Sequence, residues 1–527
     1  GMFPLLALSD RSSAALGATR DFCHGLLARF TLMDDSRSLV VLAFVAAYLL
    51  MCVGVGVWAL RRTKSPRDFF MAGRDLGVMV TGLALFSSQM SGFGFVGGPG
   101  LVYRMGLSSS WMTVIGPLAF CCSFYLLATR LRMIAELRDT ISLPDAVAAR
   151  YGSERARLLT AVAMLLGVVG YLGTQILAMA TVLRDVLNNV SFIPEVSILT
   201  CMVIACAVLV FYCVTGGILA SVYTDLVQGA IMIVAAVFVF FAALSAVDGG
   251  LTGLVTTLIE DDPEVVSPWG TLGMMGSLSW FVVFVLGSAG QPHVITKFMM
   301  NRWVEDARRT LPVSAGGYML CSSLWLSIGL AMRALVIQGG HPELASPDDA
   351  APQFLQFHAS PMLAGIVFAG LFAAIMSTAD SFLNLGAAAV VHDIPRALYG
   401  RSLSNELFWA RVATVALAVG SAMFVLYSRQ DLVALLGAFG WGTFAAALVP
   451  TVAIGFNWKR ATARAANAAI VTSLVVIFGI ELFGVAIPYG ITGGFVALLA
   501  SMTLFFGISL ASPPPTIDPD IEAVMDL

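Results

Sequence analysis

Uninterrupted apolar segments of about 20 residues recur along almost the whole chain, and they limit its fold more than any other feature. Of the 527 residues, 58% are hydrophobic and only 12% are charged, about half the charged fraction of a soluble domain. An apolar segment of this length crosses a bilayer as a helix, whereas a transmembrane barrel would show shorter, alternating segments. The sequence therefore predicts an all-α integral membrane protein.

We predict about 13 transmembrane helices, each near 20 residues or longer. Their approximate limits are residues 38–60, 76–103, 107–129, 155–187, 195–214, 217–247, 270–299, 310–338, 361–391, 406–427, 431–456, 464–482 and 486–510. The connections 248–269 and 339–360 are long enough to form small lids. The tail 511–527 is rich in proline and acidic residues, a composition typical of disorder.

Positive charge is concentrated in alternate connections between the predicted helices. One such connection reads RRTKSPR at 61–67, whereas a connection of the opposite set reads EDDPE at 260–264. Because positively charged loops stay on the cytoplasmic side, residues 1–37 are expected outside the cell and the tail 511–527 in the cytoplasm. The expected location is a cell membrane, which in a bacterium is the inner membrane.

Two predicted helices are interrupted at mid-length by polar residues and glycines. The second contains SSQMSG at 87–92, and the seventh contains GSAGQPH at 287–293. Inside a membrane, a helix opens only where its freed backbone groups line a cavity or an ion. Each break on its own could also be a kink that binds no ligand.

The two interruptions occupy matching positions in two halves of the chain. Counted from the second predicted helix, they fall in helices 1 and 6 of a ten-helix core. Matching interrupted helices are typical of transporters built from inverted repeats, with the binding site at mid-membrane. The expected division is one extra helix, the two repeats and two C-terminal helices, at residues 38–60, 61–247, 248–456 and 457–510.

Six stretches in the expected order resemble the sodium/solute symporter family over nearly the whole chain. They are DFFMAGRDLG at 68–77, SSQMSGFGFVGGPGLVYRMG at 87–106, SLPDAVAARYG at 142–152, TGGILASVYTDLVQ at 215–228, GQPHVITKFM at 290–299 and MSTADSFLN at 376–384. The resemblance is nearest to the sodium/proline symporter branch. It implies a LeuT-like core of two inverted five-helix repeats, with one extra helix before this core and two after it.

A candidate sodium site combines the first break with the ninth predicted helix. Ala374, Ser377 and Thr378 are spaced i, i+3 and i+4, so they share one helical face and offer a carbonyl and two hydroxyls. A hard cation such as sodium prefers oxygen ligands. The resemblance implies that backbone oxygens of Ser87 and Met90 complete the site. Small residues at these positions could instead serve helix packing.

Two aspartates inside predicted helices define a candidate second cation site. Charged groups within a membrane are costly and are functional candidates. The resemblance implies that some members bind a second sodium at the position of Asp225, and the hydroxyl positions one turn beyond the main site are Asp380 and Ser381 here. The pair could hold a cation, or one aspartate could carry a proton. Asp225 could also lie near the helix end and pair with solvent.

The solute is expected between the two breaks, against core helices 3, 8 and 10. The candidate solute-binding residues are Gln89, Tyr171, Gln175, Ser288, Gln291 and Trp441. Gln89 is a neutral amide where the proline branch has a carboxylate, so any role that needs a negative charge there is absent. Each polar candidate could instead make an interhelical hydrogen bond.

Together these features predict a sodium-coupled symporter that imports a small organic solute, with an amino acid such as proline favoured and Na⁺ as the only cofactor. Alternatives are proton coupling on the same scaffold, a sugar, sialic acid or carboxylate as the solute, and a membrane receptor. We find no HExxH, GxSxG or convergent carboxylate pair that would favour an enzyme. No basic, aromatic-rich cluster favours nucleic acid, and no obligatory protein partner is evident beyond the lipid bilayer.

Overall fold

The computed structural model describes residues 36–61, 65–72, 75–190, 193–427 and 433–527. This described part contains 11 helical segments long and apolar enough to cross a membrane, and two shorter apolar helices. Its only β-type pairing is an isolated bridge. The all-helical membrane prediction is confirmed, while the number of about 13 spans stays a prediction. Most of the predicted outer segment 1–37 lies outside the described residues.

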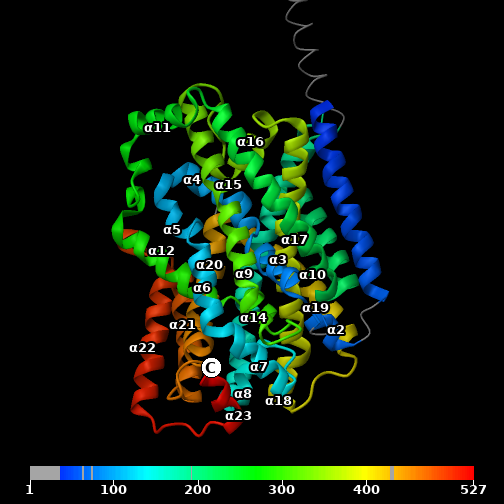
Figure 1. The fold of residues 1–527 in the computed structure, drawn as a ribbon, viewed down its shortest axis with the longest axis vertical. Helices are drawn as coiled ribbons and strands as arrows, with labels where there is room; N and C mark the ends of the chain where they lie inside the picture. Colours follow the sequence, from blue (N-terminus) through cyan, green and yellow to red (C-terminus); the bar gives the residue numbers. More distant parts are fainter. Residues whose placement is uncertain (1–35, 62–64, 73–74, 191–192, 428–432) are drawn as a thin grey trace, which may run out of the picture.

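Within the described residues, the first half of the chain forms ten α-helices, and the first of them stands at the edge of the molecule (Figure 1). They are Ser36–Arg61, α2 (Pro66–Met71), α3 (Val78–Gln89), α4 (Gly98–Met105), α5 (Ser110–Thr113), α6 (Gly116–Ser123), α7 (Thr129–Arg138), α8 (Leu143–Tyr151), α9 (Glu154–Asn188) and α10 (Ile198–Ala246). At Gly217 in α10, φ is 56° and ψ is −159°, a conformation open to glycine. This kink separates the two membrane segments that the sequence predicts there.

The described part of the second half adds 13 further α-helices, long and short, and two of the short ones, α11 and α16, lie over one end (Figure 1). The 13 helices are α11 (Gly250–Asp261), α12 (Gly273–Gly287), α13 (Pro292–Phe298), α14 (Asp306–Arg309), α15 (Leu311–Ile337), α16 (Ala350–Phe357), α17 (Pro361–Ala388), α18 (Ile394–Tyr399), α19 (Glu406–Tyr427), α20 (Val433–Leu448), α21 (Ala463–Phe483), α22 (Gly493–Ala511) and α23 (Pro519–Met525). We call the end with α11 and α16 the α11 end, and the opposite end the α8 end (Figure 1).

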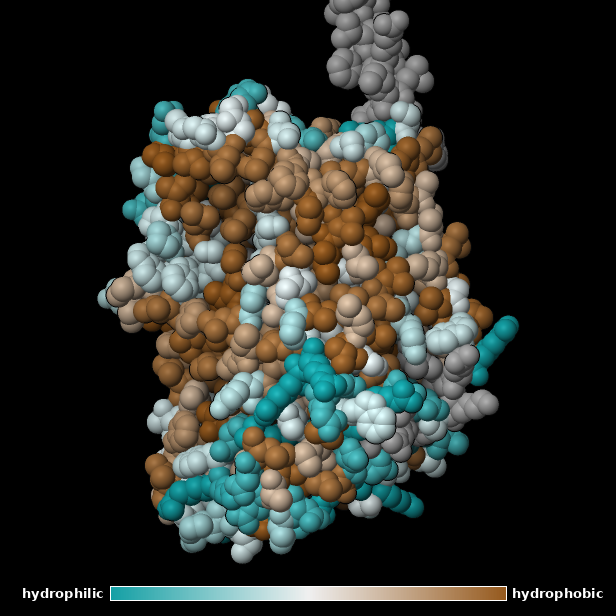
Figure 2. Space-filling model, in the orientation of Figure 1, coloured by the Kyte–Doolittle hydropathy of each residue, from teal (hydrophilic) through white to brown (hydrophobic). Residues whose placement is uncertain are grey.

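The distribution of apolar residues separates central helices from peripheral ones. In the most apolar window of the segment Pro361–Tyr399, 83% of residues are buried, against 28% in Ser36–Arg61 and 28% in α21. The helix α17 is therefore central, whereas the first helix and α21 present most of their apolar surface outward. Figure 2 shows a broad apolar belt on the visible face, with hydrophilic residues gathered toward the α8 end.

Both predicted helix breaks are present. The first follows α3, where Met90 takes φ −80° and ψ 82°, and the chain resumes as a π-helical turn over Phe93–Gly97. The second follows α12, where Gln291 is extended, and α13 begins at Pro292. A Cβ on Gly92 would lie 2.6 Å from the Cβ of Ala178, so only glycine permits this close approach of the first break to α9.

The two interrupted helices are joined at the α8 end. The Leu76 amide donates to the Met300 carbonyl at 3.4 Å, and the Arg302 amide donates to the Leu76 carbonyl at 2.9 Å. Arg132 on α7 donates from Nε to the Asn301 carbonyl at 2.6 Å and from Nη2 to the Arg302 carbonyl at 2.9 Å. These contacts tie α3, α7 and α13 to one another.

The helix α15 joins the same group. Ser314 Oγ donates to the Gly82 carbonyl of α3 at 2.9 Å. Farther along, a Cβ on Gly94 would lie 2.6 Å from the indole ring of Trp325, and a Cβ on Gly98 would lie 3.0 Å from it. Close backbone packing thus places α15 against both parts of the first interrupted helix. We call α3, α7, α13 and α15 the bundle.

The expectation of a disordered tail is wrong for residues 519–525, which form α23. The acidic residues that suggested disorder are paired with basic ones. Asp518 lies 2.5 Å from Arg138 on α7, and Glu522 lies 3.0 Å from Lys459. Ile521 is fully buried beneath them. The basic partners lie in distant segments, so the local composition of the tail does not reveal these ion pairs.

We predict that Arg132→Met lowers the free energy of unfolding by about 2 to 3 kcal/mol, because two charge-assisted hydrogen bonds are lost and the buried Asn301 carbonyl loses its donor. Thermal unfolding of the purified protein in detergent measures the effect. Arg155→Met is the matched control, because Arg155 is exposed at the same end. Equal stability of the two variants would contradict the structural role of Arg132.

Candidate functional site

Two hydroxyls of α17 meet the end of α3 at the first break. Ser377 Oγ lies 3.0 Å from the Ser87 carbonyl oxygen, and Thr378 Oγ1 lies 2.8 Å from the Ser88 carbonyl oxygen. Both hydroxyls also lie within 3.2 Å of the Ala374 carbonyl oxygen. All five residues are buried. Carbonyl and hydroxyl oxygens of two helices therefore converge on one point.

This convergence suits a hard monovalent cation, because every group in it offers a neutral oxygen. The carbonyls are available because the chain leaves the helix at residues 90–92, where the next turn would otherwise bond them. The structure brings together four of the five predicted sodium ligands: Ser87, Ala374, Ser377 and Thr378. The fifth, Met90, is buried in the break itself, and its amide donates to the Phe86 carbonyl at 3.0 Å.

A buried ion pair lies beside this cluster. Lys297 Nζ on α13 is 2.9 Å from Asp225 Oδ2 on α10, and their side chains are 2% and 0% exposed. The same ammonium donates to the Ala84 carbonyl at 3.1 Å and to the hydroxyl of Ser88. The charge pattern of the sequence did not single out Lys297, because the burial of its side chain depends on how α13 packs against α3 and α10.

The second predicted aspartate lies one helix away. Ser221 Oγ on α10 donates to Asp380 Oδ1 at 2.8 Å, and Ser221 stands about one turn before Asp225. Ser381 Oγ donates to the Ser377 carbonyl at 2.9 Å. Asp380 and Ser381 therefore border both the carbonyl cluster and the Asp225 region. That these residues hold a second cation stays a prediction.

Three predicted solute residues gather at the first break. The Tyr171 hydroxyl lies 3.3 Å from Ser91 Oγ, and the Gly92 amide donates to Gln175 Oε1 at 2.9 Å. Gln89 is buried at the end of α3. Tyr171 and Gln175, four residues apart on α9, therefore both face the opened segment.

The other three predicted solute residues gather at the second break. Gln291 Nε2 donates to the Gly287 carbonyl at 3.0 Å and to the Trp441 carbonyl at 3.2 Å. Ser288 Oγ lies 3.3 Å from Ser123 Oγ on α6. These bonds hold the second break against α20 and α6. The first group of predicted residues instead joins the first break to α9.

Aromatic rings occupy the region around both breaks. Phe93 stacks on Phe284 with ring centroids 5.8 Å apart, and Phe284 stacks on Trp441 at 5.1 Å. His293 lies 4.4 Å from Phe382 on α17, measured between ring centroids. Sequence reasoning did not single out Phe93 or Phe382. Their stacking partners are distant in sequence, so no local pattern marks them.

A narrow cavity of about 20 Å³ lies between the second break and the α8 end. Its polar lining consists of Ser142, His293, Thr296, Lys297, Ser381, Asn384 and Asp393. None of the six predicted solute residues lines this cavity. Asn384 was missed, although its position one turn after Asp380 on the same helix could have identified it.

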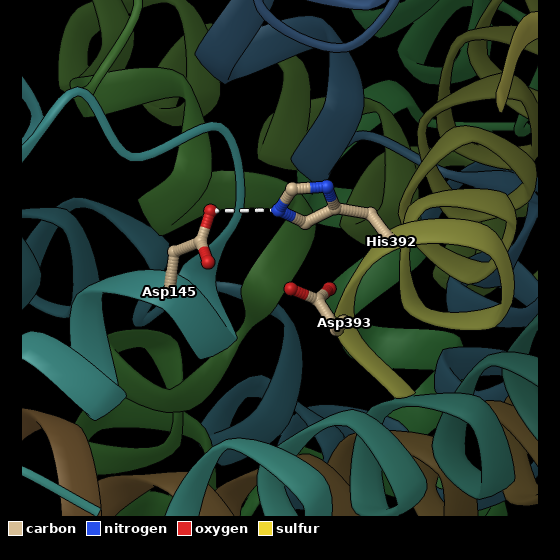
Figure 3. Close-up of side chains that lie close together, drawn as sticks. All are labelled: Asp145, His392 and Asp393. Carbon is tan, nitrogen blue, oxygen red and sulfur yellow. Dashed lines mark hydrogen bonds and ion pairs between the residues drawn. The ribbon is translucent and has the colours of Figure 1, made fainter. Parts of the chain in front are cut away.

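A charged cluster lies near the α8 end of the cavity (Figure 3). His392 Nε2 is 3.1 Å from Asp145 Oδ2, and Nδ1 is 3.1 Å from Glu406 Oε1. A neutral imidazole has one donor N–H, so both bonds require the protonated ring. Ser142 Oγ donates to Asp393 Oδ1 at 2.5 Å. The cluster joins α8 to the ends of α17 and α19.

Asp145, His392 and Asp393 lie close enough together to hold a metal ion, with one ligand atom from each within 4.8 Å of the others. However, Arg157 pairs with Asp145, and Arg396 Nη1 lies 3.6 Å from Asp145 Oδ1. Burial opposes ionisation of the Asp145 carboxyl, but the hydrogen bond and charge of His392 and the charge of Arg157 lower its pKa to about 2. The cluster is charge-balanced by protein cations, which disfavours a metal.

The fold and this site define a class. Two helices interrupted at mid-length, with the first break facing hydroxyls of a central helix, are the arrangement of a LeuT-like membrane transporter. The family model described as the sodium:solute symporter family matches residues 69–473. The chain therefore belongs to the sodium:solute symporter family, and the resemblance seen in its motifs is confirmed.

Curated relatives cover nearly the whole chain. The high-affinity proline transporter PutP of Bacillus subtilis is 27% identical over 468 residues, covering 88% of this chain and 96% of that protein. The sodium/proline symporter of Escherichia coli is 28% identical over 468 residues, covering 86% and 90%. These names point to a transporter rather than an enzyme.

Solved structures support the fold. A Na⁺-coupled sialic acid symporter in a substrate-bound, outward-open state matches with a TM-score of 0.71 and 21% identity, over 91% of this chain and 99% of that one. A nucleobase-cation-symport-1 family transporter matches with a TM-score of 0.55 and 16% identity, over 87% and 98%. The predicted LeuT-like architecture is confirmed.

We predict that Asp145→Asn lowers the free energy of unfolding by about 3 kcal/mol or more, because it leaves Arg157 and His392 without their buried anion. Since the pKa of this carboxyl is depressed, its stabilisation is complete above about pH 4 and is lost as the pH falls toward 2. Thermal unfolding at neutral pH measures the effect.

The matched control for that measurement is Glu154→Gln, because Glu154 pairs with the same arginine at 2.7 Å but is 57% exposed. An exposed pair contributes under about 1 kcal/mol. If Asp145→Asn were no more destabilised than Glu154→Gln, the buried cluster would not be a stabilising element.

Proposed function

We propose that this protein is a sodium-coupled secondary active symporter that imports a small organic solute by alternating access. One observation carries the proposal: the hydroxyls of Ser377 and Thr378 contact backbone oxygens that the break in α3 leaves free. A cation bound among these oxygens ties α3 to α17. Membership of the sodium:solute symporter family supports sodium as that cation.

In this proposal the sodium ligands are the backbone oxygens of Ser87, Met90 and Ala374 and the hydroxyls of Ser377 and Thr378. Each hydroxyl now donates its proton to carbonyl oxygens. To bind the ion, a hydroxyl turns its lone pairs toward it and keeps the proton on another acceptor. The Ala374 carbonyl lies within 3.2 Å of both hydroxyls, so it can accept one of these protons on one lone pair and face the ion with the other.

The proposed solute pocket lies between the two breaks. Its polar residues are Gln89, Tyr171, Gln175, Ser288, Gln291 and Trp441. The stacked rings of Phe93, Phe284 and Trp441 provide an apolar wall. The relatives named as proline transporters favour proline or another small amino acid. Because a sialic acid symporter has a similar fold, sialic acids, sugars and carboxylates stay alternative solutes.

Transport is proposed to proceed by rocking of the bundle against the remaining core helices. The backbone bonds between the Leu76 region and residues 300–302 support this view, because they let α3 and α13 move as one body. Sodium and solute would each raise the affinity of the other by the same factor. One charge that crosses about 100 mV supplies about 2.3 kcal/mol to the solute gradient.

We place the α8 end in the cytoplasm of a bacterial inner membrane, with residues 1–37 outside and the tail 511–527 inside. The positive-inside rule and the basic residues Arg132, Arg138 and Lys459 at this end support the assignment. The proposed division into an extra helix (38–60), two repeats (61–247 and 248–456) and two final helices (457–510) follows from the two breaks.

The function is tested by uptake into proteoliposomes. Labelled proline, other amino acids, a sugar and a sialic acid are offered with an inward sodium gradient, with a potassium gradient, and with no gradient. We expect one solute class to accumulate only with sodium, and more strongly at a negative internal potential. Uptake that ignores sodium in every condition removes the proposal.

We predict that Ser377→Ala and Thr378→Ala each raise the sodium concentration for half-maximal uptake about tenfold or more, which corresponds to about 1.4 kcal/mol for a lost oxygen ligand. Sodium titration of uptake measures it. Ser473→Ala is the control, because Ser473 is a buried serine that donates to the Ile470 carbonyl of its own helix. Unchanged sodium dependence in both site variants refutes the ligand assignment.

A second candidate function is proton coupling, and the observation that favours it concerns Asp380. Its Oδ2 makes no hydrogen bond within the described residues, and it borders a small cavity with Asn384, Cys213 and Thr414. Such a carboxyl can carry a proton. In the sodium-coupled mechanism Asp225, Asp380 and Ser381 stay a candidate second cation site, although Lys297 already pairs with Asp225.

We predict that Asp380→Asn raises the sodium concentration for half-maximal uptake by about 3- to 10-fold, because a negative charge near Ser377 is removed. Uptake is measured with a sodium gradient and, separately, with a pH gradient in sodium-free medium. Under proton coupling the wild type would accumulate solute with the pH gradient alone, and the variant would not.

A further inference from the structure

The ammonium of Lys297 has a complete set of partners. A lysine ammonium has three N–H donors. Here they are matched by three acceptors, the Asp225 carboxylate, the Ala84 carbonyl and the Ser88 hydroxyl. The acceptors belong to α3 and α10, and the lysine belongs to α13. The ammonium is thus fully coordinated at the meeting point of three helices.

These partners are the oxygen types that would bind a sodium ion: one carboxylate, one carbonyl and one hydroxyl. Both charged side chains are almost completely buried. Inside the protein, a carboxylate needs a compensating positive charge, and removing that charge is costly. Lys297 supplies the charge from within the chain, at the aspartate where a second sodium would otherwise be required.

The lysine is also coupled to the proposed sodium site. Ser88 accepts from Lys297 through its hydroxyl and from Thr378 through its carbonyl. Lys297 also lines the cavity that leads toward the α8 end. A change at Lys297 therefore affects the ion site. Because the cavity reaches Lys297, removing the ammonium would open the space beside Asp225 to a cation from this cavity.

We propose that the Lys297 ammonium is a resident cation that occupies the place of a second sodium at Asp225, so that one sodium ion crosses with each solute molecule. The inference rests on the proposed sodium-coupled function. The number of sodium ions per solute molecule sets the limit of solute accumulation. At about 100 mV, one charge per solute molecule supports roughly a fifty-fold solute gradient, and two charges would support roughly the square of that ratio.

The first test is the sodium-to-solute ratio of the wild-type protein. In proteoliposomes with fixed sodium and solute gradients, the membrane potential at which net solute flux vanishes gives the ratio. We expect one sodium and one charge for each neutral solute molecule. A ratio of two overturns the proposal. Solute uptake that ignores sodium altogether would instead refute the proposed function.

The second test removes the resident cation. Lys297→Gln leaves Asp225 without a positive partner, so we expect a second sodium to bind. The sodium dependence of solute binding then changes from hyperbolic to sigmoidal, and the transport ratio rises toward two. Lys297→Arg is the matched control, because it keeps the charge, and its ratio should remain one. A Lys297→Gln variant that transports with a ratio of one overturns the proposal.

A double variant covers the case in which Lys297→Gln is inactive. Asp225→Asn with Lys297→Gln removes both charges, so the site needs no cation, and we expect it to recover sodium-dependent solute binding with a hyperbolic sodium dependence. Binding is measured on purified protein in detergent, by scintillation proximity with the labelled solute. If the single variant is inactive and the double variant fails to recover, Lys297 does not act by neutralising Asp225, and the proposal is overturned.

Discussion

The structure depends on how an opened backbone is satisfied inside a membrane. The break after α3 frees carbonyl groups where lipid offers no hydrogen-bond partner. The hydroxyls of Ser377 and Thr378 reach these carbonyls from α17, which is largely buried. The same hydroxyls and carbonyls form the proposed sodium site. The need to pair the carbonyls that the break leaves free therefore links the break, the hydroxyls of α17 and the proposed cation.

Buried charge follows the same rule on a larger scale. The carboxylate of Asp225 is paired with Lys297, and the carboxylate of Asp145 is paired with Arg157 and His392. The Asp225–Lys297 and Asp145–His392 pairs join segments far apart in the chain. The first pair links bundle helices to α10, so it lies where the proposed movement occurs. The second joins α8 to α17, outside the bundle, so it can hold those segments together while the bundle moves.

Most of the fold could be predicted from local patterns, because apolar runs, alternating charge and glycine-rich interruptions are properties of neighbouring residues. The shared face of Ala374, Ser377 and Thr378 could be predicted for the same reason, because it follows from spacing within one helix. Lys297 was not singled out because its pairing with Asp225 depends on how α13 packs against α3 and α10, which no local pattern reports. The helix α23 was missed because its stability comes from Arg138 and Lys459, which are distant in sequence.

The sequence by itself determined that this is a helical membrane protein with two interrupted helices and a hydroxyl-bearing helix suited to sodium. These features depend on composition and on spacing within single helices. Only the tertiary structure decided which oxygens meet, that the ammonium of Lys297 faces Asp225, and that His392 lies between Asp145 and Glu406. Such pairings depend on helix depth and rotation, which are set by close packing among many side chains at once.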